Sequence, residues 1–190
     1  MNDSNNKQKP KASKLLIAVL ITALIIFIIC INWPSSPHHG KLLSKHIKCA
    51  IHLYALWEPV LDYAIDNDGC FPPAEDWCDL LLNEVDFHHE MRDRYFVCES
   101  SDAGTGQSSY ALNKNIAGLK IDEVTQEAVL LFETTPGWNR SGTSEILARE
   151  AHEVKEGILG CNVLFAGGTV EFVKKEDLDT LRWEPELLSF

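Results

Sequence analysis

The residues best suited to chemistry in this sequence are its six cysteines, whose thiols can form disulfide bonds or bind metal ions. Cys30 lies inside a long apolar run and is expected to be a membrane-buried thiol. The other five leave at least one thiol unpaired, since disulfides use cysteines two at a time. We predict one bridge, Cys78 to Cys98, because each closely follows an aromatic residue, Trp77 or Phe96. A loop of that length stabilises by about 3 kcal/mol.

Other roles for the remaining cysteines stay open at this stage. Cys70 could compete with Cys98 for Cys78, and the sequence alone does not fix the pairing. Cys49 and Cys161 have the surroundings of small buried hydrophobic residues. A structural zinc site usually shows cysteines or histidines at short ligand spacings, and no CxxC pair occurs here. We therefore predict no metal site.

The histidines occur as two adjacent pairs, His38–His39 and His88–His89, and singly within a predicted helix at His46 and His52. Neighbouring side chains on a helix or strand point apart, so an adjacent pair rarely supplies two ligands to one ion. His46 and His52 have no second potential ligand four residues further on. We therefore expect the adjacent pairs to lie on the solvated surface, and no metal-binding motif such as HExxH occurs.

The sequence contains no recognisable catalytic frame. It has no GxSxG turn, no phosphate-binding loop and no dinucleotide fingerprint. The segment Asp66–Gly69 resembles the start of a calcium-binding loop, but Ala74–Trp77 does not continue the alternation of ligands that an EF-hand requires. We expect neither enzymatic activity nor a cofactor.

The net charge of −11 is distributed unevenly, because four lysines and a single acid precede the apolar run. The rest of the chain is therefore strongly acidic. An acidic domain repels the phosphate backbone of nucleic acids, so nucleic acid is not an expected partner.

Residues 15–31 form an uncharged apolar run that Asn32 and Trp33 extend. This length suits a transmembrane helix, which needs roughly 17 to 25 residues. The lysines before the run and the acids after it predict a cytoplasmic tail, 1–14, and a single-pass anchor, 15–33, in the inner membrane. The alternative is a cleaved signal peptide. Either way, the domain lies in the periplasm or outside the cell.

A linker is predicted at 34–40, where two prolines and a glycine stand close together. Apolar residues then recur every three or four positions, which predicts one long helix over about 41–65, with a kink at Pro59. Asp66–Gly69 predicts a turn that ends this helix with a left-handed glycine. A second, short helix is expected at 77–85.

Short segments of β-forming residues follow, separated by loops that are rich in glycine and asparagine. The last two form a hairpin that turns at Gly167–Gly168. Together these features predict an α+β domain over 41–190, with the long helix packed on a small antiparallel sheet. The predicted strands are 108–112, 128–132, 162–165 and 169–173.

Several patterns along the chain together resemble a known family. The end of the long helix resembles that of the type II secretion pseudopilins, in its residues Tyr63, Asp66, Asn67, Gly69, Phe71 and Pro72. Later segments are similar to prepilin-type proteins with an H-x9-DG domain: WCDLL from Trp77, FVCES from Phe96, SYALN from Ser109, LFET from Leu131 and NVLFAGGTVEFV from Asn162.

This chain departs from the family pattern at both ends. Ala12–Leu15 lacks the glycine cleavage site and the glutamate of a prepilin. Gly167 replaces the aspartate of the H-x9-DG signature, Gly157 replaces its histidine, and His152 stands five residues too early. We therefore expect a divergent relative that stays anchored.

The resemblance implies a pilin-like domain that acts through protein contacts with other envelope proteins, in a secretion or pilus-like system. Some pseudopilins bind calcium near their C-terminal sheet, but no residues here can be assigned to such a site. The alternative is an exported ligand-binding or enzymatic domain that has kept a pilin-like scaffold.

Overall fold

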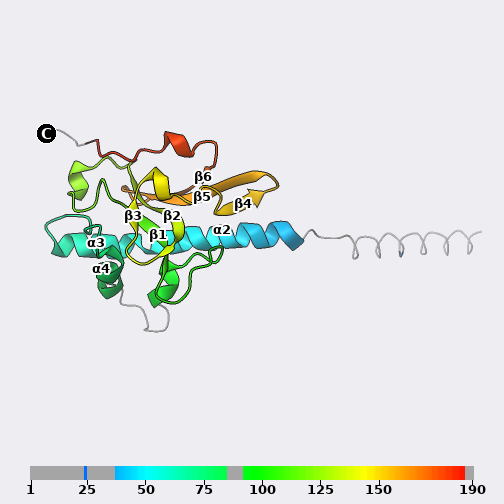
Figure 1. Cartoon of the computed structure of the whole chain (residues 1–190), viewed down its shortest axis with the longest axis horizontal. Coiled ribbons are helices and arrows are strands. Elements are labelled where there is room, and N and C mark those ends of the chain that lie inside the picture. The colour runs from blue at the N-terminus through cyan, green and yellow to red at the C-terminus, as the bar shows by residue number, and fades with distance from the viewer. Residues whose placement is uncertain (1–23, 25–36, 85–91, 187–190) are drawn as a thin grey trace, which may run out of the picture. The chain divides into compact units, whose positions relative to one another are not determined.

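The computed structural model describes residue 24 and residues 37–84 and 92–186 (Figure 1). The chain divides into two compact units, Met1–Pro37 and His38–Phe190. The predicted tail 1–14 and the predicted anchor 15–33 lie outside the described residues, apart from Leu24. Among the residues that the structure describes, no helix combines the length and apolar character needed to cross a bilayer.

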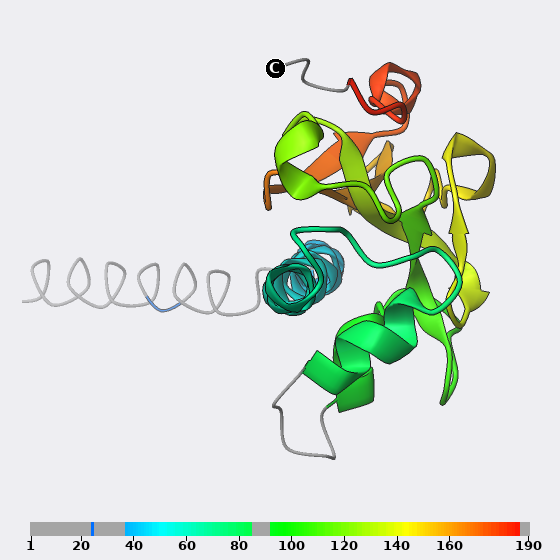
Figure 2. The ribbon, with the colours of Figure 1, turned by 90° about the vertical axis from the view of Figure 1, so that its left-hand side faces the viewer.

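The predicted long helix is present as two helices in succession, α2 (Pro37–Ala55) and α3 (Trp57–Asp66). They follow one another nearly in line (Figures 1 and 2). The break falls at Leu56, three residues before Pro59, because a proline has no N–H to donate to the carbonyl of Ala55. The predicted interruption near Pro59 is present, but it divides the helix into two where one kinked helix was predicted.

The start of α2 corrects the predicted linker, 34–40. Pro37–Gly40 form the first turn of α2 rather than a hinge. A proline is well tolerated at the first position of a helix, where its missing N–H would have no partner within the helix. After the end of α3, Gly69 adopts φ of 78° and donates its N–H to the carbonyl of Ala64 at 2.8 Å, as the predicted C-cap requires.

The chain then continues through α4 and a series of short elements. The helix predicted at 77–85 is confirmed as α4 (Trp77–Glu84). It is followed by the 3-10 helix η1 (Arg92–Phe96). Three more 3-10 helices lie between or after the strands: η2 (Ile121–Glu123), η3 (Ser144–Ile146) and η4 (Leu178–Thr180).

Six strands form one sheet in the order β3-β1-β2-β5-β4, with β6 also paired to β5. All pairings are antiparallel except that of β1 with β3. The four predicted strands correspond to β1, β2, β5 and β6, whereas β3 and β4 were not predicted. The bounds are β1 Ser108–Asn113, β2 Val129–Gly137, β3 Ser141–Gly142, β4 His152–Lys155, β5 Ile158–Phe165 and β6 Val170–Lys174.

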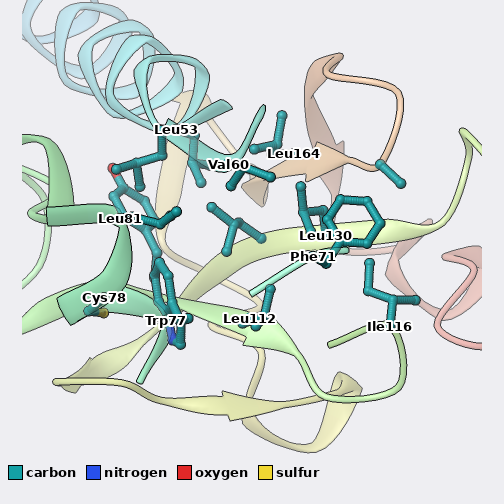
Figure 3. Close-up of a cluster of buried hydrophobic side chains, with 14 of the residues drawn as sticks. Leu53, Val60, Phe71, Trp77, Cys78, Leu81, Leu112, Ile116, Leu130 and Leu164 are labelled. Carbon is teal, nitrogen blue, oxygen red and sulfur yellow. The ribbon is translucent and has the colours of Figure 1, made fainter. Parts of the chain in front are cut away.

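Both faces of the sheet are covered, so the domain has two apolar cores. The larger core lies between the helices and one face of the sheet and includes Leu53, Trp77 and Leu130 (Figure 3). The smaller core lies around Phe132, whose ring meets that of Trp183 edge to face at 4.9 Å. Because both faces are covered, all six residues of β1 are buried instead of alternating with exposed ones. The domain is an α+β fold, as predicted.

Candidate functional site: a buried cluster of cysteine, histidine and glutamate

Cys98 forms a disulfide bond with Cys49, not with Cys78, so the predicted pairing is wrong. Cys49 lies on the buried face of α2, and Cys98 follows η1. Their Cα atoms are 4.9 Å apart although 49 residues separate them. Within the described part of the chain this is the single bridge.

The segment after η1 reaches Cys49 because it runs along α2. The Lys48 ammonium pairs with the Glu99 carboxylate at 3.0 Å. The His52 ring contacts the carbonyl of Val97 through Nδ1 at 2.8 Å. These contacts lie on both sides of Cys98 in the sequence and place its sulfur beside α2.

Cys78 belongs to a different neighbourhood. Its N–H donates to Asn139 Oδ1 at 2.7 Å, and the Asn139 N–H points back to its sulfur at 3.4 Å. Burial raises the pKa of the Cys78 thiol to about 12, and burial together with the charge of Glu133 also raises that of Cys161. Both thiols are therefore protonated and unreactive near neutral pH. Cys70 is free and half-buried.

Next to the disulfide lies a buried pair of ionisable residues, Glu133 on β2 and His152 on β4. Glu133 Oε1 and His152 Nε2 are 2.7 Å apart, and each side chain is only 2% exposed. Charges are costly to bury, so such a pair requires further hydrogen bonds to be tolerated.

Those hydrogen bonds are present on both partners. The Asn162 N–H donates to Glu133 Oε2 at 2.7 Å, and the Asn162 side-chain amide donates to Oε1 at 3.3 Å. On the other partner, His152 Nδ1 contacts the hydroxyl of Ser100 at 3.2 Å. The Ser100 N–H also points to the sulfur of Cys98 at 3.4 Å.

The buried cluster, by which we mean Cys49, Cys98, Glu133 and His152, brings two sulfurs, one imidazole nitrogen and one carboxylate oxygen within 4.8 Å of one another. All four residues are buried. Cys98 Sγ and His152 Nε2 are 3.7 Å apart. Sulfur, imidazole nitrogen and carboxylate oxygen are the donor types that zinc takes in proteins.

His46 lies at the edge of the buried cluster. Its ring centroid is 5.6 Å from that of His152 and 4.7 Å from that of Phe172. Burial lowers the pKa of His46, and so does the neighbouring His152, while the charge of Glu133 opposes the shift. Two buried polar atoms near the cluster, His46 Nδ1 and Asn162 Oδ1, have no hydrogen-bond partner among the described residues.

A cavity of about 190 Å³ leads to the cluster from outside. Cys98 and Glu133 both line it. Its other walls carry hydroxyl groups, among them those of Ser101, Ser109 and Thr134. Cys98 and Glu133 are each only 2% exposed, so the cavity borders the cluster without opening it widely to solvent.

A second candidate surface is the outer face of α2 and α3, defined by Ile47, Ile51, Tyr54, Leu61 and Ile65. These large hydrophobic side chains are all exposed, Ile65 by 77% and Tyr54 by 61%. The spacing of three, four or seven places them on one side of the two helices, opposite the buried Leu53 and Val60.

The charges along these helices are divided by sign. Three lysines and no acid occur in α2, whereas three acids and no lysine or arginine occur in α3. The two helices therefore carry opposite charge. The acids are Glu58, Asp62 and Asp66, and the lysines are Lys41, Lys45 and Lys48.

Comparison with protein-family models, with curated proteins and with solved structures gives no match for this chain. The resemblance to pseudopilins therefore stays a prediction.

Cys98 was predicted to form a disulfide, but the buried cluster as a whole was missed because its residues come from four separate parts of the chain. Each has an ordinary neighbourhood in sequence, and no ligand pair sits within one helical turn. The one usable signal was His152, which stands close to the H-x9-DG position but out of register with it.

Proposed function

We propose that this chain is a membrane-anchored, pseudopilin-like protein whose extracytoplasmic domain works through contacts with other protein chains. The observation that carries the proposal is the outer face of α2 and α3, where five large hydrophobic side chains are exposed in one stripe. Surface hydrophobic residues that occur singly need no explanation, but a contiguous apolar stripe marks an interaction surface. A helix face of this kind is suited to packing against another helix.

The partner that fits best is a second copy of the chain, shifted along the helix axis. Ile47 and Ile51 are repeated fourteen residues later as Leu61 and Ile65. A parallel copy displaced by about 21 Å would align the two halves of the stripe, since a helix rises 1.5 Å per residue. The α2 helix of one copy, which carries lysines, would then lie beside the α3 helix of the next, which carries acids.

This arrangement suits chains that are anchored from the same side of a membrane, because the helices stay parallel. A staggered contact is also open-ended, so each copy can bind a further copy. The domain needs no cofactor for this role.

The rival function, ligand binding or catalysis, has less support. The cavity beside the buried cluster measures about 190 Å³, below the roughly 300 to 1,000 Å³ that is usual for organic ligands. A larger hollow of about 610 Å³ is lined by Arg149, Lys174 and Lys175, but each of these cations is already paired with a carboxylate.

A photo-crosslinking amino acid at position 54, in the full-length chain in its native membrane, tests the contact. We expect a covalent dimer of this chain, because Tyr54 lies in the middle of the outer face. The matched control carries the same amino acid at Glu171, which is exposed on β6. Glu171 shares a face of its strand with Val173, which packs against the smaller core on the far side of the sheet. Equal dimer yields from both positions, or crosslinks from position 54 to other proteins alone, would overturn the homotypic contact.

The anchor itself is tested by fractionation. The full-length chain should stay in the membrane fraction after extraction with alkaline carbonate, at the mass of the uncleaved sequence. A soluble chain that begins near Trp33 would instead indicate a cleaved signal peptide.

A further inference from the structure

We propose that the dithiol form of this chain binds one zinc ion at the buried cluster, through Cys49, Cys98, His152 and Glu133. This inference is independent of the contact function, because the cluster lies inside the domain and the outer face lies on its surface.

The donor set matches zinc in kind and in number. Structural zinc sites have four ligands in a tetrahedron, drawn from cysteine sulfur, histidine nitrogen and carboxylate oxygen. The bond lengths in such sites imply roughly 3.4 to 3.8 Å between neighbouring ligand atoms. Here the four atoms already lie within 4.8 Å of one another, and Cys98 Sγ is 3.7 Å from His152 Nε2. Small side-chain movements would complete the tetrahedron once the two sulfurs are separate.

The groups around the donors are those that orient metal ligands. A histidine that binds a metal through Nε2 normally donates its Nδ1 proton to an oxygen nearby, and Ser100 Oγ lies 3.2 Å from Nδ1 of His152. Glu133 presents Oε1 to the cluster while the Asn162 N–H holds Oε2 at 2.7 Å. The Ser100 N–H, 3.4 Å from Cys98 Sγ, would stabilise a thiolate at that position.

Charge explains why a divalent cation belongs there. Two thiolates and one carboxylate form a buried group of three negative charges, which a zinc ion reduces to one. Zinc binds cysteine as the thiolate, so binding by the dithiol form releases the two thiol protons and should strengthen with pH. Calcium and magnesium prefer oxygen donors alone, so the two sulfurs disfavour them.

The disulfide and the metal site exclude each other because they use the same two sulfur atoms. Reduction breaks the Cys49–Cys98 bond with two electrons and two protons. A phosphine reductant supplies the electrons and becomes a phosphine oxide, taking its oxygen from water, which also provides the two protons. A small reductant and a metal ion would enter from the cavity that Cys98 and Glu133 line.

Cobalt(II) is the probe for the test, because it takes tetrahedral thiolate sites and is coloured. The full-length chain in detergent is reduced with a phosphine, cleared of free metal and titrated with cobalt chloride. We expect one equivalent to produce the visible bands of tetrahedral cobalt and a near-ultraviolet band from thiolate coordination. One equivalent of zinc should remove both. The oxidised chain, treated in the same way, should show neither.

Variants connect the spectrum to the named residues. Cys49→Ser should remove much of the thiolate band, and His152→Ala should weaken binding by more than ~10-fold. Ser100→Ala, which removes only the hydroxyl beside His152 Nδ1, should weaken binding by about 10-fold. The matched control is Cys70→Ser, which should leave the titration unchanged, since Cys70 is the one free cysteine among the described residues that lies outside the two cores.

The titration of the unmodified chain decides the matter even if a variant fails to fold. A reduced chain that keeps its native circular dichroism but gives no tetrahedral cobalt spectrum would overturn the proposal. The same holds if the oxidised chain binds cobalt equally well, or if Cys70→Ser abolishes the spectrum.

Discussion

The phenolic hydroxyl of Tyr110 on β1 donates a hydrogen bond of 3.2 Å to the main-chain carbonyl of Cys49 on α2, and so joins the sheet to the helix at a residue of the disulfide. Both residues are completely buried. Burial and the charge of Glu133 raise the pKa of Tyr110, so its hydroxyl stays protonated and able to donate.

Tyr110→Phe removes this hydroxyl and little else. We expect the free energy of unfolding to fall by about 1 kcal/mol, the usual net value of one hydrogen bond. Urea denaturation should show a lower midpoint with an unchanged m-value. Tyr54→Phe, on the exposed outer face, is the control and should leave the midpoint in place. Equal midpoints for both variants would mean that the Tyr110 bond contributes nothing.

Reduction of the Cys49–Cys98 bond should lower the free energy of unfolding by about 4 kcal/mol, because the bridge closes a loop of 49 residues. Urea denaturation with and without a phosphine, both in the presence of a chelator, measures the difference. Peptide mapping of the unreduced chain should recover Cys49 linked to Cys98. A linked pair of Cys78 and Cys98 would contradict this pairing.

Gly168 should tolerate no side chain, because it has φ of 83° and because an added Cβ would lie 2.5 Å from Nε1 of Trp57. We expect Gly168→Ala to cost more than the ~1 kcal/mol that an alanine pays for a left-handed conformation alone. Gly157→Ala is a matched control, since Gly157 has φ of 78° but nothing near its missing Cβ. Thermal unfolding of the two variants separates the clash from the backbone strain. Equal shifts would exclude a role for Trp57.

Local patterns were enough to predict the elements that depend on them. The hairpin of β5 and β6 turns at Gly167–Gly168, and α4 follows its predicted bounds to within one residue. In contrast, β4 was missed because its sequence, HEVK, does not show the alternation of apolar and polar residues that predicts a strand. It is a strand only because β5 offers it an edge to pair with.

The buried cluster could not be predicted because nothing in the sequence says which distant segments meet. The aromatic neighbours of Cys78 and Cys98 suggested a bridge between them, but α4 turns Cys78 toward Asn139 instead. The carbonyl of Val97 and the side chain of Glu99 make the contacts that bring Cys98 to α2. Neither residue stands in a distinctive sequence pattern. Tertiary packing therefore determines which two cysteines form the disulfide.

His46 should make the domain less stable in acid. Its folded pKa lies below the ordinary 6.5, because of burial and of His152, although Glu133 acts against the shift. The unfolded chain therefore binds a proton near pH 6.5 that the folded chain binds only at lower pH, so stability is lost as the pH falls. Urea midpoints between about pH 7.5 and pH 5.5 should decline less steeply in His46→Gln than in the wild type. Parallel curves for the two proteins would show that His46 does not contribute.

The pair of Glu133 and His152 should be strongly coupled, since the two side chains meet at 2.7 Å and are 2% exposed. Removing one partner leaves the other buried without it, so Glu133→Gln and His152→Gln should each destabilise by about 3 kcal/mol or more. The double variant should cost less than the sum of the two, with a coupling energy of roughly 1 to 3 kcal/mol. A double-mutant cycle by urea denaturation of the oxidised chain measures this coupling without interference from metal binding. The control cycle pairs Glu133→Gln with Asp179→Asn, which removes a charge at an exposed ion pair on η4, and should be additive. If the two cycles give equal coupling, the short contact between Glu133 and His152 has no energetic role in the fold.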